Sequence, residues 1–320
     1  MNCAQPRRIR AFGLILAASV AFSAALPAIH AQDSAQGSNP PKMAPSELVR
    51  LVVANELAAA DHHEIHHMFH SRRQTSKGSQ TRVYVETNDA LAAMLIASND
   101  RPVTAEQQQA ENNHLASLVN NPEQLRKKAA REKEDEDRSL RIVKALPAAF
   151  CYEYAGTEDS AAGLGKVGHQ LVKLSFKPNP AYSPPSHVEQ VLTGMQGNLL
   201  IDPQTKRLAR IDGTMFREVT FGWGILGHLD QGGHFRVQQA DLGLGDGSWG
   251  VTEISLNMTG KLLMFKGINI VSDEVLSDFQ RLPDKLTFAQ GVEMLKTEEV
   301  KLAHNNHAAE TVEAKKEQSN

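Results

Sequence analysis

Five of the thirteen histidines lie within nine residues of the sequence, from His62 to His70. Inside this cluster, His63, Glu64 and His67 match the H-E-x-x-H pattern of zinc proteases. In such proteases two imidazoles one helical turn apart bind the metal, and the glutamate activates a metal-bound water. The cluster therefore raises zinc-dependent hydrolysis as a hypothesis.

The residues that follow the cluster argue against a catalytic metal. A zinc-protease helix continues past its second histidine, whereas residues 71–78 are mostly polar and end at Gly78, which interrupts a helix. Glu86 is suitably spaced to be a third ligand, but it lies in residues 81–87, which alternate as in a strand. We expect no metal site and no cofactor, and we keep the zinc hydrolase that uses His63, Glu64 and His67 as an alternative function.

Two other patterns that could carry chemistry also lack the required context. G-x-G-x-x-G occurs at Gly163–Gly168 and at Gly222–Gly227, but a dinucleotide site needs a helix directly after the glycines, and neither segment predicts one. Cys151 lies in an alternating segment, which predicts a small buried side chain. No pair of acids is placed for general acid and base catalysis. We expect no catalytic residue, and the chain is predicted not to be an enzyme.

The stretch from Gly194 to Val271 predicts consecutive antiparallel strands. Its clearest part is a hairpin in which Asn198–Ile201 and Arg207–Ile211 flank Asp202–Thr205, where proline presets the φ angle of a tight turn and aspartate can cap it. Further strand-length segments follow between clusters of Gly, Asp and Asn: 216–221, 235–240, 249–256 and 262–271. This spacing is typical of a sheet, sandwich or barrel.

Helical patterns precede this sheet. Ser46, followed by Glu47 and regularly spaced apolar residues, predicts a capped amphipathic helix that continues to Ala60. Residues 81–98 predict a second hairpin. Residues 104–146 predict an inserted pair of helices, because Thr104–Gln107 forms a capping box and Pro122 suits the first position of the next helix. Pro147 is expected to end that helix.

The second helix of this pair is densely charged from Arg126 to Lys144. Opposite charges recur at the i,i+4 spacing of a helix in Lys128/Glu132, Glu134/Arg138 and Asp137/Arg141. We favour a solvated helix that touches the rest of the chain through its few apolar residues, Leu140, Val143 and Leu146. The alternative is an arm that binds a protein partner in the cell envelope.

The N-terminal segment has the pattern of an export signal. Three arginines precede the apolar run Ala11–Leu26, and Ala28–Ala31 offers a cleavage site with small residues. We expect a signal peptide at 1–31, a disordered leader at 32–45, a single domain at 46–300 that includes the insertion 104–146, and a disordered tail at 301–320. The cleaved protein is expected to be periplasmic or secreted.

Charge and cysteine content restrict the function further. Removal of residues 1–31 takes away three arginines and no acidic residue, so the formal charge changes from −3 to −6. A mildly acidic protein is poorly suited to bind nucleic acid, which we therefore do not expect as a partner. Cys151 would be the only cysteine left, so an intramolecular disulfide is excluded and stability must come from a core.

Several short segments together carry a resemblance to a family of uncharacterised exported bacterial proteins. Besides the charged run, they are Ala145–Phe150, Phe176–Pro180, Ile201–Pro203, Leu208–Gly213, Phe221–Gly224, Gly232–Phe235 and Gly260–Lys266. The family is in turn distantly similar to the periplasmic carriers that sort lipoproteins to the outer membrane. That resemblance implies an α+β fold in which a curved antiparallel sheet, a half-barrel, packs on helices.

The same resemblance implies a non-enzymatic periplasmic carrier or chaperone that binds lipid or acylated protein. An apolar concave face either packs on helices or holds an acyl chain. The candidate ligand-binding residues on that face are Leu199, Ile201, Phe221, Trp223, Phe235, Trp249 and Phe265. A structural module of the cell envelope, with these side chains simply forming the core, is a further alternative.

Overall fold

The hairpin around Asp202 forms as its turn residues predict. The computed structural model of the protein describes residues 43–61, 65–222, 226–262 and 266–317. Strands β7 (Met195–Asp202) and β8 (Arg207–Met215) pair antiparallel. Between them, Asp202 Oδ1 accepts hydrogen bonds from the backbone N–H groups of Gln204 and Thr205 at 2.9 and 3.2 Å. The aspartate therefore caps the turn, as expected for this residue type.

The chain divides into two units, which we describe separately. Unit 1 contains the chain up to His63, Arg73–Gly78 and Lys133–Leu276. Unit 2 contains Glu64–Arg72, Ser79–Glu132 and Ser277–Asn320. Because helix α3 (Pro122–Ala149) and strands β1 (His66–Thr75) and β13 (Lys266–Leu282) each cross a boundary in the sequence, both units contain part of each.

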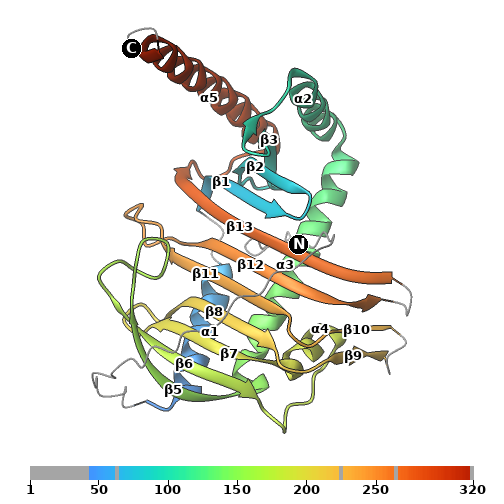
Figure 1. The fold of residues 1–320 in the computed structure, drawn as a ribbon, viewed down its shortest axis with the longest axis vertical. Coiled ribbons are helices and arrows are strands. Elements are labelled where there is room, and N and C mark those ends of the chain that lie inside the picture. The colour runs from blue at the N-terminus through green and yellow to red at the C-terminus, as the bar shows by residue number, and fades with distance from the viewer. Residues whose placement is uncertain (1–42, 62–64, 223–225, 263–265, 318–320) are drawn as a thin grey trace, which may run out of the picture. The chain divides into compact units, whose positions relative to one another are not determined.

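Unit 1 is built on an open antiparallel sheet (Figure 1). Its strand order is β13-β12-β11-β8-β7-β6-β5. The remaining strands of this order are β5 (Phe150–Asp159), β6 (Gln170–Pro178), β11 (His234–Asp241) and β12 (Trp249–Leu262). A short hairpin of β9 (Val219–Phe221) and β10 (Gly227–Leu229) extends it, since β10 also pairs with β12. The α+β class and the curved antiparallel sheet predicted from the sequence are confirmed.

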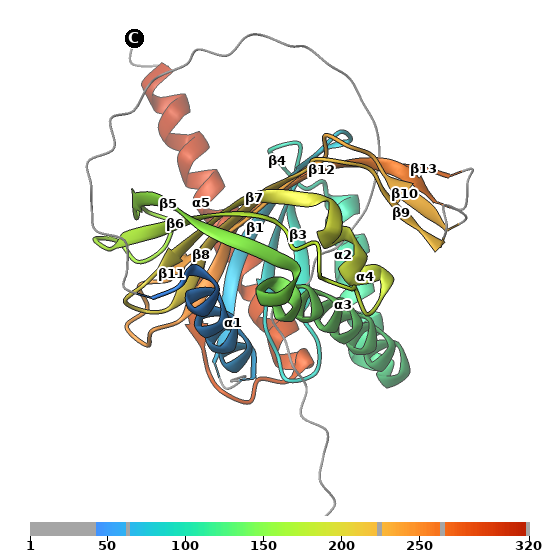
Figure 2. The same ribbon diagram turned by 90° about the horizontal axis from the view of Figure 1, so that it is seen from below.

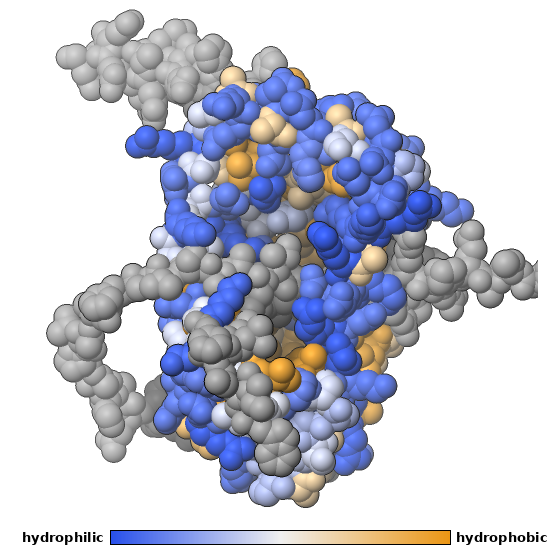
Figure 3. Space-filling model, turned by 90° about the vertical axis from the view of Figure 1, so that its right-hand side faces the viewer, coloured by the Kyte–Doolittle hydropathy of each residue, from blue (hydrophilic) through white to orange (hydrophobic). Residues whose placement is uncertain are grey.

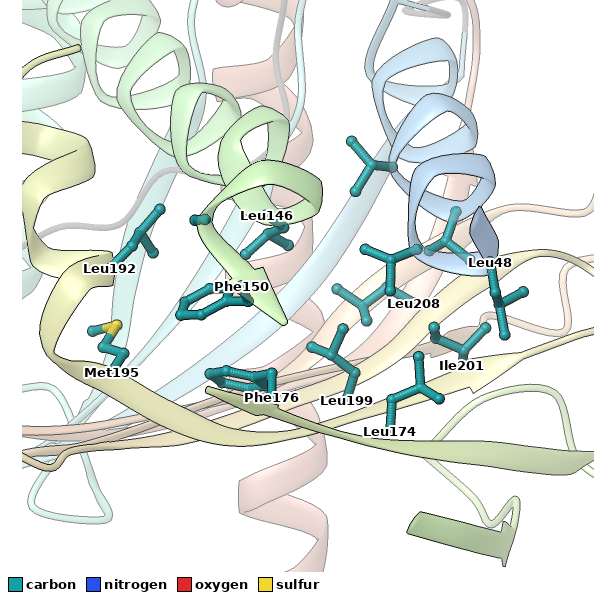
Figure 4. Close-up of a cluster of buried hydrophobic side chains, with 14 of the residues drawn as sticks. Leu48, Leu146, Phe150, Leu174, Phe176, Leu192, Met195, Leu199, Ile201 and Leu208 are labelled. Carbon is teal, nitrogen blue, oxygen red and sulfur yellow. The ribbon is translucent and has the colours of Figure 1, made fainter. Parts of the chain in front are cut away.

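Helices pack against one face of this sheet (Figure 2). Helix α1 (Pro45–Asp61) and the C-terminal end of α3 contribute apolar side chains to the main core. The 3₁₀ helix η1 (Val191–Gly194), which follows α4 (His187–Gln190) and leads into β7, contributes as well. The buried side chains of this core, seen in Figure 4, include Leu48, Leu146, Phe150, Leu174, Phe176, Leu192, Met195, Leu199, Ile201 and Leu208.

A buried ion pair fixes α1 to β8. Glu56, which is 7% exposed, accepts hydrogen bonds from Arg207 through both carboxylate oxygens, at 2.9 and 3.0 Å. Its Oε1 also accepts a hydrogen bond from the backbone N–H of Leu208 at 2.8 Å. Because a buried charge is costly unless it is paired, these contacts select one position of the helix on the sheet.

The opposite face of the sheet carries several ion pairs. Arg210 bonds to Glu158 at 2.8 Å, and Asp212 accepts hydrogen bonds from Arg236 at 2.6 Å and from His234 at 3.2 Å. Burial acts to raise the pKa of Asp212, but these hydrogen bonds prevail and hold it below its ordinary value. Hydrogen bonding by Asp212 in turn raises the pKa of Arg236.

Unit 2 has a separate core. Its strands are parts of β1 and β13 together with β2 (Gly78–Val85), β3 (Ala92–Ser98) and β4 (Arg101–Pro102), and β2 and β3 form the hairpin predicted at 81–98. Helices α2 (Ala105–Asn120) and α5 (Phe288–Glu317) pack on it. Core side chains include Met68, Val83, Val85, Met94, Leu115, Leu118, Phe288 and Leu295.

Several local details differ from the sequence predictions. Helix α1 begins at Pro45, and Glu47 and Leu48 donate to the carbonyl of Ala44, so Ser46 is not the N-cap. Helix α3 continues through Pro147 to Ala149, because a proline in a last turn removes only one intrahelical hydrogen bond. The Cys151 side chain is exposed rather than buried, since it faces away from the core on β5.

The helical pair matches the sequence more closely. Thr104 and Gln107 form the predicted capping box at the start of α2. On α3, Lys128 pairs with Glu132 and Arg138 with Glu134. Asp137 pairs with Lys133 rather than with Arg141, which is the opposite direction along the helix. Much of the charge on α3 is thus neutralised within the helix itself.

Candidate functional site

The apolar face of unit 1 is closed where helices lie over it. Leu199 and Ile201 are 1% and 0% exposed, and both belong to the main core with side chains from α1. Figure 4 shows Leu48 of α1 close above Ile201 and Leu208. The hydroxyls of Tyr152 and Tyr154 donate to the carbonyls of Leu146 and Met43 at 2.7 Å each, and burial raises the pKa of both phenols. We call this region, represented by Leu174, Leu199, Ile201 and Leu208, the covered part of the face.

The same face continues into a region where Met258 and Ile270 are buried but several neighbouring apolar side chains are only partly buried. These partly buried side chains pack against the main core and yet keep contact with solvent. They come from β9, β10, β11, β12 and β13, and we call them the half-buried patch: Phe221, Leu229, Phe235, Leu256 and Ile268.

The strand register explains why these residues share one face. Phe235 lies opposite Leu256 in the β11–β12 pair, and Ile268 lies opposite Gly260 in the β12–β13 pair. Residues 256 and 260 are separated by two steps of the alternation, so their side chains point the same way. Leu229 and Val219 oppose each other in the β9–β10 hairpin, two residues from Phe221.

The structure thus brings together four of the seven candidate residues. Leu199 and Ile201 lie in the covered part, and Phe221 and Phe235 lie in the half-buried patch. Trp249 instead packs against a separate cluster formed by Leu164, Leu171, Leu200 and Ala209. Leu200 belongs to this cluster although its neighbours in sequence, Leu199 and Ile201, belong to the main core. Trp223 and Phe265 lie outside the described residues.

Sequence reasoning missed three members of the patch, Leu229, Leu256 and Ile268. The candidate list beyond β7 contained aromatic side chains only. Leu256 and Ile268 occupy alternating positions in segments already predicted as strands, so the period-two pattern could have identified them. Leu229 lies in a three-residue strand, which is too short to show such a pattern.

A surface hollow of about 650 Å³ lies next to the patch. It is lined by residues 184–186 and by His187, Gln190, Thr193 and Arg217. The His187 ring meets the Phe221 ring edge to face, with centroids 6.4 Å apart and an interplanar angle of 90°. The Gln190 side chain donates to the carbonyl of Thr220 at 2.7 Å. These contacts join the hollow directly to the strand that carries Phe221.

The zinc-protease pattern does not lie on a helix where it is described. His67 belongs to strand β1, and its Nδ1 lies 3.2 Å from Glu86 Oε2, which also accepts a hydrogen bond from the His67 backbone at 2.8 Å. His63 and Glu64 lie outside the described residues. Because the pattern requires two histidines on successive turns of one helix, the strand geometry of His67 removes the basis for the zinc hydrolase hypothesis.

Within the described ranges, one group of side chains has ligand atoms close enough to share a cation. Glu218, His228 and Asp230 place these atoms within 4.8 Å of one another. The β9–β10 hairpin accounts for the group, since His228 lies on β10, Asp230 directly follows that strand and Glu218 directly precedes β9. Lys261 lies opposite His228 on β12, where its positive charge opposes cation binding.

The surface contains little continuous apolar area on the side shown in Figure 3, where the described residues are mostly hydrophilic and apolar residues form small groups. In the part of the chain that the structure describes, none of the helices has both the length and the apolar character needed to cross a membrane.

Comparisons with known proteins give distant structural likenesses. No model of a known protein family matches the sequence, and no curated protein matches it either. The fold is similar to a DUF1329 family protein from Desulfovibrio piger, with 10% identity, coverage of 74% of this chain and 93% of that one, and a TM-score of 0.27. It is also similar to a domain assigned to outer membrane lipoprotein sorting from Vibrio parahaemolyticus, with 10% identity, coverage of 77% and 97%, and a TM-score of 0.29.

Proposed function

We propose that this chain is a non-enzymatic carrier that holds the acyl chain of a lipid or an acylated protein against the half-buried patch. The observation that carries the proposal is the contrast along one apolar face. Side chains such as Leu199, which pack with those of α1, are fully buried, whereas Phe221, Phe235 and Leu256 farther along the face are only partly buried. A folded chain gains by burying such surface, and an apolar ligand supplies the missing cover.

The energetics are sufficient for reversible binding. Each buried methylene contributes roughly 0.8 kcal/mol, so about eight of them contribute roughly 6 kcal/mol. Part of this is lost to the ordering of the ligand and of the side chains that contact it. The result is an affinity suitable for a carrier, which must release its cargo as well as bind it.

We also propose that the protein acts in the periplasm or after secretion. Residues 1–31 have the charged start, apolar run and small-residue cleavage site of an export signal. An envelope carrier of this kind needs no cofactor and no catalytic residue.

A displacement titration with a fluorescent fatty acid tests the proposal. We expect the wild type to bind the probe saturably and Phe221→Asp to weaken binding about tenfold or more, because a carboxylate in the patch must be desolvated by the acyl chain. Val167→Asp is the matched control: Val167 is 72% exposed in the loop between β5 and β6, outside the patch, so the same substitution there should leave binding unchanged.

The titration also has a clear negative result. If the wild type binds no fatty acid of any chain length, the apolar face is only a core, and the carrier function is wrong. The alternative is then a structural module of the cell envelope in which the charged helix α3 binds a protein partner.

A further inference from the structure

The hollow beside the patch differs chemically from the patch itself. Arg217 and His187 are exposed in it, together with the polar side chains of Ser186, Gln190 and Thr193. None of the residues that line it is acidic. A site with this composition suits a negatively charged group better than an apolar one.

Arg217 is held in place without being neutralised. Its Nη2 donates to the carbonyl of Thr193 at 2.8 Å, and its guanidinium lies over the Phe216 ring, 5.5 Å from the ring centroid. Within the described residues, no carboxylate forms an ion pair with it. The remaining guanidinium N–H groups can therefore donate to a ligand.

Other arginines of the unit 1 sheet are paired. Arg207 bonds to Glu56, Arg210 to Glu158 and Arg236 to Asp212. Arg217 lies between β8 and β9 at the end of the same sheet, four residues before Phe221. An arginine that is positioned by a backbone carbonyl and an aromatic ring, and that lacks an acidic partner, has its charge available at the edge of the apolar face.

We propose that Arg217 and the hollow around it bind the anionic head of an amphiphile, a carboxylate or a phosphate, whose acyl chain lies on the half-buried patch. This inference rests on the proposed carrier function and adds the chemical class of the ligand to it. Arg217 donates to the oxygens of the head, in the two-pronged geometry that guanidinium groups favour. His187 forms the wall between head and chain, since its ring contacts Phe221.

Isothermal titration with three ligands that share one sixteen-carbon acyl chain tests the inference. The probes are palmitate, palmitoyl lysophosphatidate and monopalmitin, each kept below the concentration at which it forms micelles. Monopalmitin carries no charge. We expect Arg217→Gln to weaken binding of the anionic probes about tenfold or more, the loss expected for a hydrogen bond to a charged group, and to leave monopalmitin binding unchanged.

Arg50→Gln is the matched control. Arg50 is exposed on α1 and does not line the hollow, so its replacement makes the same change in net charge elsewhere. It should leave all three affinities unchanged. Arg217→Lys, which keeps the charge but loses the fork of donors, should fall between wild type and Arg217→Gln.

The outcomes separate this inference from the proposed function. If all three probes bind and Arg217→Gln affects all of them equally, or affects none, the anionic head is not held by Arg217 and the inference is wrong while the carrier function stands. If no probe binds the wild type, both are wrong. If only palmitate or only the lysophosphatidate loses affinity, that probe identifies the head as carboxylate or phosphate and supports the inference.

Discussion

The covered part and the half-buried patch belong to one apolar face, but they differ in what completes them. Glu56 and Arg207 fix α1 over the covered part, and Leu199 and Ile201 are completely buried there. Over the patch, by contrast, Phe235 and Leu256 are left partly exposed. The fully buried side chains under α1 stabilise one end of the face, and we propose that a ligand covers the other end.

The largest expected effect is a loss of stability when a side chain of the covered part is shortened. Leu199→Ala should lower the free energy of unfolding by about 4 kcal/mol, because it removes a fully buried side chain and leaves a cavity. The folded fraction should still bind fatty acid with wild-type affinity. Urea denaturation gives the first quantity and titration the second, and a loss of affinity without a loss of stability would mean that the covered part also binds ligand.

Breaking the Glu56–Arg207 ion pair beneath α1 should cause the next largest loss of stability. Glu56→Gln keeps the volume of the side chain but leaves the Arg207 charge unpaired in a largely buried site, at a cost of about 3 kcal/mol. Glu158→Gln is the control, since the Glu158–Arg210 pair is more exposed and should cost under about 1 kcal/mol. Equal losses in urea denaturation would show that α1 is not fixed by Glu56.

A substitution in the half-buried patch should affect ligand binding more than stability, the opposite of Leu199→Ala. Leu256→Ala removes the same atoms from a partly buried position, so it should cost only about 1–2 kcal/mol of stability. It should nevertheless weaken fatty acid binding severalfold, because it removes part of the contact surface. If Leu256→Ala proves as destabilising as Leu199→Ala and leaves binding intact, the distinction between the two regions is wrong.

The smallest effect concerns the opposite face and depends on pH. The pKa of Asp212 in the folded protein is below its ordinary value of 3.8, so its contribution to stability is complete above that value and is lost as the pH falls through the lower, folded-state pKa. Asp212→Asn should therefore flatten the acid limb of the stability curve below about pH 4 and leave ligand binding at neutral pH unchanged. Thermal unfolding at a series of pH values measures this, and an unchanged acid limb would contradict it.

Local chemistry made much of the fold predictable. The Asp202 turn and the Thr104 capping box form as their residue types predict, because each depends on atoms only two or three residues away. Ion pairs were less predictable where a residue has two possible partners. Asp137 has a lysine four residues before it and an arginine four residues after it, and the sequence does not say that Lys133 is the partner.

The candidate site was predictable in part, for a physical reason. Alternation places Leu199 and Ile201 on one face, but which part of that face a helix covers depends on contacts between residues more than a hundred positions apart, such as Glu56 with Arg207. Trp249 was included because it is aromatic, whereas it lies seven residues from Leu256, an odd number, so simple alternation does not place the two side chains on the same face. The sequence did not indicate Arg217, because the feature that distinguishes it is that none of the described carboxylates forms an ion pair with it.

Native mass spectrometry with saturated fatty acids of increasing length tests most directly whether the half-buried patch holds an acyl chain. We expect a complex of one ligand per chain. Its affinity should rise by up to about 0.8 kcal/mol with each added methylene until the patch is filled. Phe221→Asp should weaken the complex about tenfold or more, and Val167→Asp should leave it unchanged. An affinity that does not change with chain length, or a complex that Phe221→Asp leaves intact, would contradict the proposal.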